Sequence, residues 1–271
     1  VRGKDVFVTQ SPPAPLNTHL MEQLIMLDSM KRASARRINV VSPFYPYARQ
    51  DKKGRGREPI SARLVADLYK TAGASRIMSV DLHTAQIQGF FDGPVDHLFA
   101  IPLLADYIRG QVEGEKVTVV SPDTGRVRVA EQWADRLGGV PLAFVHKSRD
   151  LTTPNKAESK TVVGDVEGRV CVLIDDMIVT GGTIAGAVRI LKDAGAKDVI
   201  IAATHAVFSD PAAQRLGDSG AREIVVTNTL PIPPEKRFEK LTVLSIAPLI
   251  ARAIREVFED GSVTSLFDGD A

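Results

Sequence analysis

The sequence lacks the features that would indicate a disulfide-stabilised, membrane-spanning or nucleic-acid-binding protein. Its one cysteine, Cys171, allows no intrachain disulfide and fits a reducing compartment. No apolar run approaches transmembrane length, and the N-terminus has no signal-peptide pattern. The 34 basic and 33 acidic residues nearly balance, so there is no global footprint for nucleic acid. We therefore expect a cytoplasmic protein with neither a membrane nor a nucleic-acid partner.

The length and composition fit two domains. A chain of 271 residues is long for one core, and its 44% hydrophobic and 25% charged fractions are typical of globular proteins. The chain begins at Val1, almost directly inside a predicted strand, so we expect an upstream piece to be missing.

Short apolar segments alternate with segments of helical spacing along the whole chain. The predicted strands are 5–10, 38–41, 76–80, 116–120, 142–145, 170–174, 198–203, 223–227 and 241–246. The predicted helices include 17–35, capped by Asn17, and 60–71, 85–89, 103–109, 126–137, 211–216 and 248–258. Residues 151–168 are polar and predict a mobile loop with a hairpin. This alternation predicts an α/β fold of mainly parallel sheets flanked by helices, with ligands beyond the carboxyl ends of the strands.

The most informative stretch is VCVLIDDMIVTGGT, from Val170 to Thr183. It predicts a buried strand that ends in two carboxylates, a glycine turn, and a helix that begins near Ile184. Glycines let backbone N–H groups approach a phosphate, and a helix N-terminus adds positive potential. The carboxylates can accept hydrogen bonds from ligand hydroxyls. A phosphorylated sugar therefore fits this junction, although a solvated strand end with a tight turn gives the same pattern.

Four segments resemble the ribose-phosphate pyrophosphokinases (phosphoribosyl diphosphate synthases, or PRPP synthetases). They are PFYPYARQDKK at 43–53, VDLHTAQIQGFFD at 80–92, VVSPDTGRVRVA at 119–130 and VLIDDMIVTGGT at 172–183. The last segment alone would indicate only a phosphoribosyltransferase-like fold, whereas DLHTAQIQGFF together with YARQD is far more specific.

The resemblance implies two phosphoribosyltransferase-like domains and a reaction for nucleotide biosynthesis. Residues 1–102 with the tail 255–271 would form the ATP side, and 103–254 the ribose 5-phosphate side. Members of the family transfer the diphosphoryl group of ATP to the 1-hydroxyl of ribose 5-phosphate, giving PRPP and AMP. The resemblance also implies Mg²⁺, activation by inorganic phosphate at a site that includes Ser262, Thr264 and Ser265, and a homohexamer built from dimers.

The resemblance carries family roles onto matching residues. Ribose 5-phosphate would be bound by Arg149, Asp175, Asp176, Val179, Thr180, Gly181, Gly182 and Thr183. ATP would be bound by Arg49, Gln50 and Asp51, the metal by His83 and Asp123, and catalysis would use Lys147 and Arg149. Without the resemblance, ordinary structural roles are at least as good: a hydrogen-bonded histidine, an Asx-capped turn at Asp123, and solvated cations.

Two departures from the family pattern keep alternatives open. The family usually has an acidic residue where this chain has Val179, and it has a further segment upstream that contacts adenine. We expect the valine to lower affinity for ribose 5-phosphate or turnover. A catalytically impaired regulatory subunit and a type I phosphoribosyltransferase are the alternatives to the synthase. The ATP-type segment at Arg49 disfavours the transferase, and retention of Lys147 and Arg149 disfavours the regulatory subunit.

Overall fold

The computed structural model describes residues 1–148 and 159–267, and the chain divides into two compact units. Unit 1 comprises Val1–Phe99, Thr229–Pro231 and Ser245–Ala271, and unit 2 comprises Ala100–Asn228 and Ile232–Leu244. The sequence pattern predicted that residues 245–254 belong to the second domain, whereas the structure groups them with unit 1. The last strand of the second sheet ends at Leu244, and the helix that follows belongs to unit 1.

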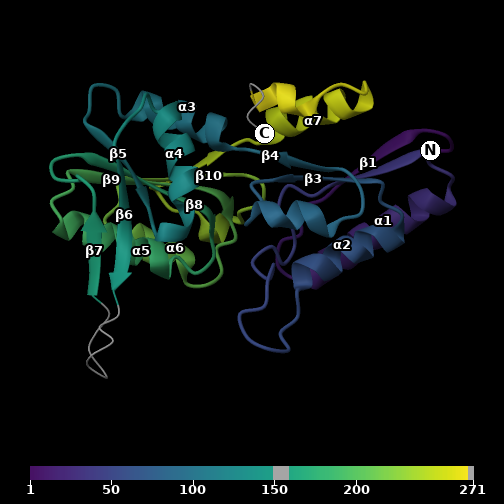
Figure 1. Cartoon of the computed structure of the whole chain (residues 1–271), viewed down its shortest axis with the longest axis horizontal. Coiled ribbons are helices and arrows are strands. Elements are labelled where there is room, and N and C mark those ends of the chain that lie inside the picture. The colour runs from purple at the N-terminus through teal and green to yellow at the C-terminus, as the bar shows by residue number, and fades with distance from the viewer. Residues whose placement is uncertain (149–158, 268–271) are drawn as a thin grey trace. The chain divides into compact units, whose positions relative to one another are not determined.

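Unit 1 contains a fully parallel sheet with the strand order β1-β2-β3-β4. Its strands are β1 (Asp5–Thr9), β2 (Arg37–Val41), β3 (Arg76–Val80) and β4 (Val95–Leu98). Helices α1 (Leu16–Arg32) and α2 (Ser61–Ala72) cover one face, and α7 (Ala247–Phe258) covers the other (Figure 1). Two 3-10 helices also belong to this unit, η1 (Ala85–Phe90) and η4 (Val263–Phe267).

Unit 2 contains a larger sheet with the strand order β11-β10-β9-β8-β5-β6-β7. Its strands are β5 (Val117–Ser121), β6 (Leu142–Ser148), β7 (Ser159–Val163), β8 (Val170–Ile178), β9 (Asp198–Ala206), β10 (Glu223–Thr227) and β11 (Leu241–Leu244). Among the described strands, only β6 and β7 pair in antiparallel fashion. The α-helices are α3 (Ile101–Gln111), α4 (Val127–Arg136), α5 (Gly182–Asp193) and α6 (Ala212–Gly217), and the 3-10 helices are η2 (Thr124–Arg126) and η3 (Pro234–Lys236). In Figure 1, α3 and α4 lie on one face of the sheet and α5 and α6 on the other.

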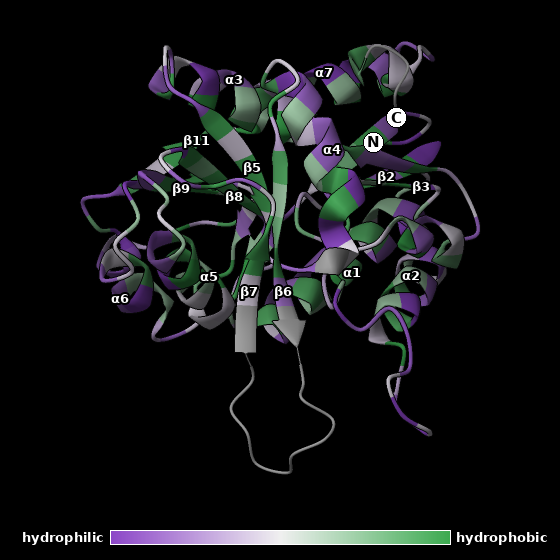
Figure 2. Ribbon diagram, turned by 60° about the vertical axis from the view of Figure 1, so that its left-hand side comes forward, coloured by the Kyte–Doolittle hydropathy of each residue, from purple (hydrophilic) through white to green (hydrophobic). Residues whose placement is uncertain are grey.

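The core of unit 2 is centred on β8. Residues 170–174 of this strand are at most 1% exposed, because helices cover both faces of the sheet. Figure 2 shows the same central strands as a continuous hydrophobic band. Cys171 lies inside this core, where burial raises the pKa of its thiol to about 11 and leaves it unreactive.

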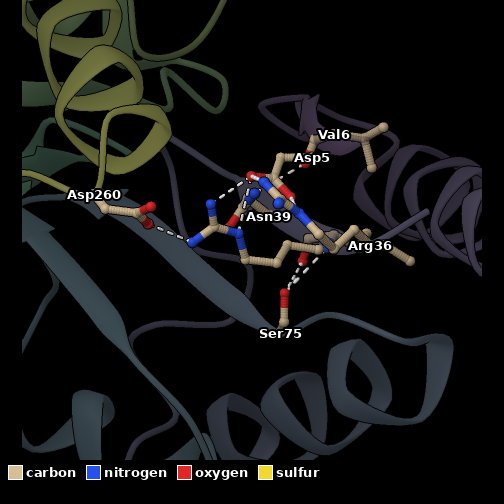
Figure 3. Close-up of polar contacts among 8 residues, drawn as sticks. Asp5, Val6, Arg36, Asn39, Ser75 and Asp260 are labelled. Carbon is tan, nitrogen blue, oxygen red and sulfur yellow. Dashed lines mark hydrogen bonds and ion pairs between the residues drawn. The ribbon is translucent and has the colours of Figure 1, made fainter. Parts of the chain in front are cut away.

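The C-terminal segment is tied to the first sheet by shared ion pairs (Figure 3). Arg37 Nη2 lies 2.5 Å from Asp5 Oδ2, and Arg37 Nη1 lies 2.6 Å from Asp260 Oδ1, just beyond α7. Arg36 Nη2 also reaches Asp5 Oδ2, at 2.7 Å. Hydrogen bonds from Arg36 and then from Arg37 hold the pKa of the Asp5 carboxyl well below its usual range. The Arg37–Asp260 pair thus links the region just beyond α7 to β2 within unit 1.

Most predicted elements are present, but several of their details differ from the prediction. Helix α1 begins at Leu16 after Pro15, and Asn17 is therefore inside the first turn instead of capping it. Strand β4 was not predicted, because four residues that include Asp96 and His97 carry too weak an apolar pattern. Strand β8 continues to Ile178, because its pairing with β9 extends past the carboxylates to Ala206.

The predicted loop and hairpin at 151–168 are described only in part. Residues 151–158 lie outside the described residues, and those that follow include β7, which forms a hairpin-type antiparallel pair with β6. Within the described residues, no helix combines the length and apolarity needed to cross a bilayer.

Candidate active site

Two adjacent carboxylates lie in the second half of β8. The side chains of Asp175 and Asp176 are 16% and 6% exposed. The Asp176 N–H donates to Asp175 Oδ1 at 2.9 Å, and the Met177 N–H donates to Asp176 Oδ1 at 2.8 Å. Because the backbone of the same strand holds one oxygen of each carboxylate, the pair is oriented before any ligand binds.

A guanidinium from another element contacts both carboxylates. Arg126 Nε lies 3.0 Å from Asp175 Oδ1, and Arg126 Nη2 lies 2.7 Å from Asp176 Oδ1. Nothing in the sequence pattern singles out this arginine, because the contact joins the end of η2 to a distant strand. A basic residue three positions after the candidate metal ligand Asp123 was the only available signal.

The acid pair carries more negative charge than one guanidinium can balance. Burial, and then the neighbouring Asp176 carboxylate, raise the pKa of Asp175 to about 8, while Arg126 acts in the opposite direction. Two acids this close titrate as a unit, and Arg126 compensates the charge of one of them. The oxygens of both carboxyl groups can accept hydrogen bonds from ligand hydroxyls.

The glycine turn that follows β8 opens directly into helix α5. Gly181 has φ +70° and is the residue before the helix, which begins at Gly182, two residues earlier than predicted. Thr180, Gly182 and Thr183 are exposed at the start of this twelve-residue helix, whose first-turn N–H groups have no partner within the helix. A phosphate can be bound by these N–H groups and the positive end of the helix dipole.

Val179 is held in the turn by its backbone. It is half-buried, and its carbonyl oxygen accepts a hydrogen bond from the Ser209 N–H at 2.9 Å. On the other side of the turn, Arg215 Nη1 donates to the Thr180 carbonyl at 3.2 Å. Hydrogen bonds to two successive carbonyl groups, those of Val179 and Thr180, therefore hold the backbone of the turn.

Asp123 lies at the carboxyl end of β5 and caps the turn that follows. Its Oδ1 accepts a hydrogen bond from the Gly125 N–H at 2.8 Å, which is the Asx-type role expected from the sequence alone. The residue is exposed, so this structural contact does not bury the carboxylate away from a ligand.

In unit 1, two backbone hydrogen bonds hold the segment that follows β3, one to a residue of β4 and one to a histidine side chain. Asp81 has φ +38°, and its N–H donates to the Leu98 carbonyl at 2.8 Å. The next N–H, from Leu82, donates to His97 Nε2 at 2.9 Å. His83, the candidate metal ligand, follows directly and is half-buried. His97 therefore belongs to the support of this segment, which the sequence did not indicate.

The ATP-type segment contacts the same region of unit 1 through a buried carboxylate. Asp51 is 4% exposed, and its Oδ2 accepts hydrogen bonds from Thr84 Oγ1 at 2.6 Å and Gln86 Nε2 at 2.7 Å. Arg49 and Gln50 are exposed beside it. Asp51 thus joins the two loops, and the exposed guanidinium of Arg49 can pair with an anionic ligand.

Comparison with known proteins gives a consistent answer along the chain. Residues 1–73 match the model of the N-terminal domain of ribose phosphate pyrophosphokinase, and residues 143–268 match the phosphoribosyl synthetase-associated domain. The ribose-phosphate pyrophosphokinase of Mycobacterium tuberculosis strain H37Rv is 71% identical over 271 residues, which cover all of this chain and 83% of that relative. The chain belongs to the ribose-phosphate pyrophosphokinase family.

Further members of the family support the same assignment. The ribose-phosphate pyrophosphokinase of Streptomyces coelicolor is 67% identical over 98% of this chain and 82% of its own length. The crystal structure of phosphoribosylpyrophosphate synthetase from Mycobacterium smegmatis superposes with a TM-score of 0.91 at 69% identity, covering 96% of this chain and 85% of that one. The family resemblance and the α/β fold predicted from the sequence are therefore confirmed.

The structure brings together some of the residues assigned by pyrophosphokinase resemblance and leaves others undescribed. Asp175, Asp176 and the residues 179–183 form one continuous strand–turn–helix junction in unit 2. Asp51 joins its loop to the segment of His83 in unit 1. Lys147 lies on β6, which runs three residues further than predicted, and Arg149 lies outside the described residues.

Proposed function

We propose that this chain binds ribose 5-phosphate at the β8–α5 junction and converts it with ATP to PRPP and AMP. The observation that carries the proposal is the acid pair followed by a left-handed glycine at the start of α5. Asp175 and Asp176 bind the 2- and 3-hydroxyls of the ribose. The 5-phosphate is held by residues 180–183 at the helix N-terminus, with Arg149 as a further anion ligand.

ATP binds to the exposed part of the segment in unit 1. Arg49 and Gln50 contact the nucleotide, and the guanidinium of Arg49 can pair with phosphate or stack on adenine. Asp51 contributes by holding its loop against Thr84 and Gln86, because its carboxylate is already buried and hydrogen-bonded there.

His83 and Asp123 are the proposed protein ligands for Mg²⁺. Among the described residues, no group of three or more His, Cys, Asp or Glu side chains could form a metal cage. The exposed Asp123 fits a cation that keeps most of its waters and takes its other oxygens from ATP, as Mg²⁺ usually does. When bound, the ion neutralises charge on the polyphosphate.

The reaction requires positioning and charge neutralisation. The ribose 1-hydroxyl oxygen attacks the β-phosphorus of ATP and releases its proton to solvent. The bond from that phosphorus to the bridging α,β-oxygen breaks, and AMP leaves with that oxygen. Lys147 and Arg149 are proposed to stabilise the charge on the transferred diphosphoryl group. The acid pair fixes the sugar, so that the attacking hydroxyl is presented in one orientation.

The alternatives have less support. A type I phosphoribosyltransferase would have no use for the ATP-type segment that matches the N-terminal pyrophosphokinase domain. A catalytically impaired regulatory subunit is suggested by Val179, whose carbonyl oxygen accepts a backbone hydrogen bond from the Ser209 N–H.

Several further properties are proposed from the family resemblance. We propose a cytoplasmic homohexamer that is activated by inorganic phosphate. Ser262 Oγ and Thr264 Oγ1 lie 2.7 Å apart, and Ser265 Oγ donates to the Ser262 carbonyl at 2.6 Å, so three hydroxyls cluster near the C-terminus. The single buried thiol of Cys171 is compatible with a reducing compartment.

The test is the stoichiometry of the products. The protein is incubated with ATP, Mg²⁺ and ribose 5-phosphate, and AMP and PRPP are measured by chromatography. We expect equal amounts of the two products. Production of ADP in place of AMP, or no AMP from a folded sample, would overturn the proposal.

A further inference from the structure

Arg126 contacts both carboxylates of the acid pair with one guanidinium group. Nε binds one carboxylate and Nη2 the other, at 3.0 and 2.7 Å, and each contact is made to an Oδ1 atom. The same Oδ1 atoms accept the backbone N–H groups of Asp176 and Met177. Each Oδ1 atom therefore has two donors, which fixes the rotation of both carboxylate groups.

This contact differs from the surface ion pairs of the molecule. The Arg126 side chain is 16% exposed, whereas Arg32, Arg63 and Arg109 pair with acids while more than half exposed. Ion pairs at the surface contribute little to stability. A partly buried guanidinium beside two acids compensates their charge and also restrains the orientation of both carboxylates. Removing it would leave two adjacent acids with less compensation and with one fewer restraint each.

The fold places Arg126 through the turn that contains Asp123. The Asp123 side chain caps η2, and Arg126 is the last residue of η2 and the one before α4 begins. Arg128, two positions later on α4, is exposed instead. A short capped turn therefore directs one arginine of the pair to β8 and leaves the other on the surface.

We propose that Arg126 is a positioning residue for the cis-diol of the sugar phosphate, a proposal that rests on the function proposed above. It holds the two carboxylates in the orientation that accepts two neighbouring hydroxyls and lowers the net charge they present to an anionic sugar. It contacts the acid pair and acts on the sugar through it. A site built to hydrogen-bond a hydroxyl discriminates strongly against an analogue that lacks it. Arg126 consequently contributes to the preference for ribose 5-phosphate over 2-deoxyribose 5-phosphate.

The test compares three variants with the unmodified protein. Arg126→Gln removes the charge, Arg126→Lys keeps the charge without the two-point geometry, and Arg128→Gln is the matched surface control. KM for ribose 5-phosphate, KM for ATP, kcat and the ratio of kcat/KM for ribose 5-phosphate over 2-deoxyribose 5-phosphate are measured by AMP formation.

We expect Arg126→Gln to raise KM for ribose 5-phosphate by roughly 10–100-fold, the effect of losing a charge-assisted contact. KM for ATP should stay within about twofold, the sugar selectivity should fall, and Arg126→Lys should recover part of the loss. Arg128→Gln should behave as the unmodified protein. An unchanged KM and selectivity in Arg126→Gln would overturn the proposal, as would equal changes in both KM values with a lowered melting temperature. If the unmodified protein makes no AMP, the proposed function itself fails, and this inference fails with it.

Discussion

Val179 lies in the turn that is proposed to bind the ribose phosphate, at a position where the family resemblance predicts an acid. Its carbonyl oxygen accepts a hydrogen bond from the Ser209 N–H, and its side chain offers no hydrogen-bond acceptor. The half-buried position lies one residue beyond β8 and two before Gly181, within the proposed site. Substitution of this residue by an acid therefore tests how much the proposed site gains from a third carboxylate.

Restoring the acid should improve use of the sugar. We predict that Val179→Asp raises kcat/KM for ribose 5-phosphate by about tenfold, because one further charge-assisted hydrogen bond becomes possible. Val179→Asn, which has the same shape without the charge, should give a smaller gain. Steady-state AMP formation at varied ribose 5-phosphate measures both, and an unchanged kcat/KM in Val179→Asp would contradict this role.

Asp175 should make stability depend on pH. Its folded pKa is raised to about 8 by burial and by Asp176, against the effect of Arg126, whereas in the unfolded chain it titrates near 3.8. The folded state therefore binds more protons between these values, and the associated stability is fully present below about 3.8 and lost as the pH rises through about 8. As the pH rises from about 3.8 to about 8, the free energy of unfolding of the native protein should therefore fall relative to that of the Asp175→Asn variant.

The fluorescence of Trp133 can report this transition, because it is the only tryptophan of the chain and is buried on α4 of unit 2. Urea unfolding of the native protein and of Asp175→Asn is followed between pH 5 and pH 9. Parallel pH profiles for the two proteins would mean that Asp175 is not the group responsible.

At the scale of elements, the β8–α5 junction depends on the conformation of one glycine. Gly181 has φ +70°, and an added Cβ would meet Leu216 only at ordinary contact distance, 3.4 Å. The cost of replacing it is therefore backbone strain and not a clash. Gly182 has no positive φ, is exposed, and would place its Cβ 3.6 Å from Arg215 Nη1.

The two glycines should consequently respond differently to alanine. Gly181→Ala is predicted to lower the free energy of unfolding by about 1–2 kcal/mol. Gly182→Ala should leave stability nearly unchanged and raise KM for ribose 5-phosphate, since its methyl group would lie where the phosphate approaches the helix N–H groups. Trp133-detected unfolding and AMP kinetics separate these effects, and a stability loss confined to Gly182→Ala would refute the assignment.

Elements with a strong local pattern could be predicted from the sequence, and contacts between elements could not. The apolar run of β8 and the glycines of the turn carry their own pattern, so the sequence alone predicts the junction. The predicted end of β8 is too early, because its last residues are set by pairing with β9. Arg126 and the buried link from Asp51 to Thr84 depend on residues that meet only after folding.

At the scale of the whole molecule, family membership follows from agreement along the entire chain. The relatives from Mycobacterium tuberculosis and Streptomyces coelicolor align with 98% or more of it, and the chain covers 82–83% of their lengths. Each unit has its own mainly parallel sheet, and C-terminal residues from Ser245 onward return to unit 1. The candidate residues divide accordingly, with the ATP-type segment in unit 1 and the acid pair in unit 2.

A single substitution can show whether the acid pair of β8 binds the sugar. Asp176→Asn keeps the shape of the side chain and removes its charge, while Asp218→Asn changes an acid elsewhere in unit 2, on the residue after α6. The measurement is kcat/KM for ribose 5-phosphate, followed by AMP formation at saturating ATP. We predict a loss of roughly 10–100-fold in Asp176→Asn and none in Asp218→Asn. An equal kcat/KM for Asp176→Asn and the unmodified protein would show that the acid pair does not bind the sugar.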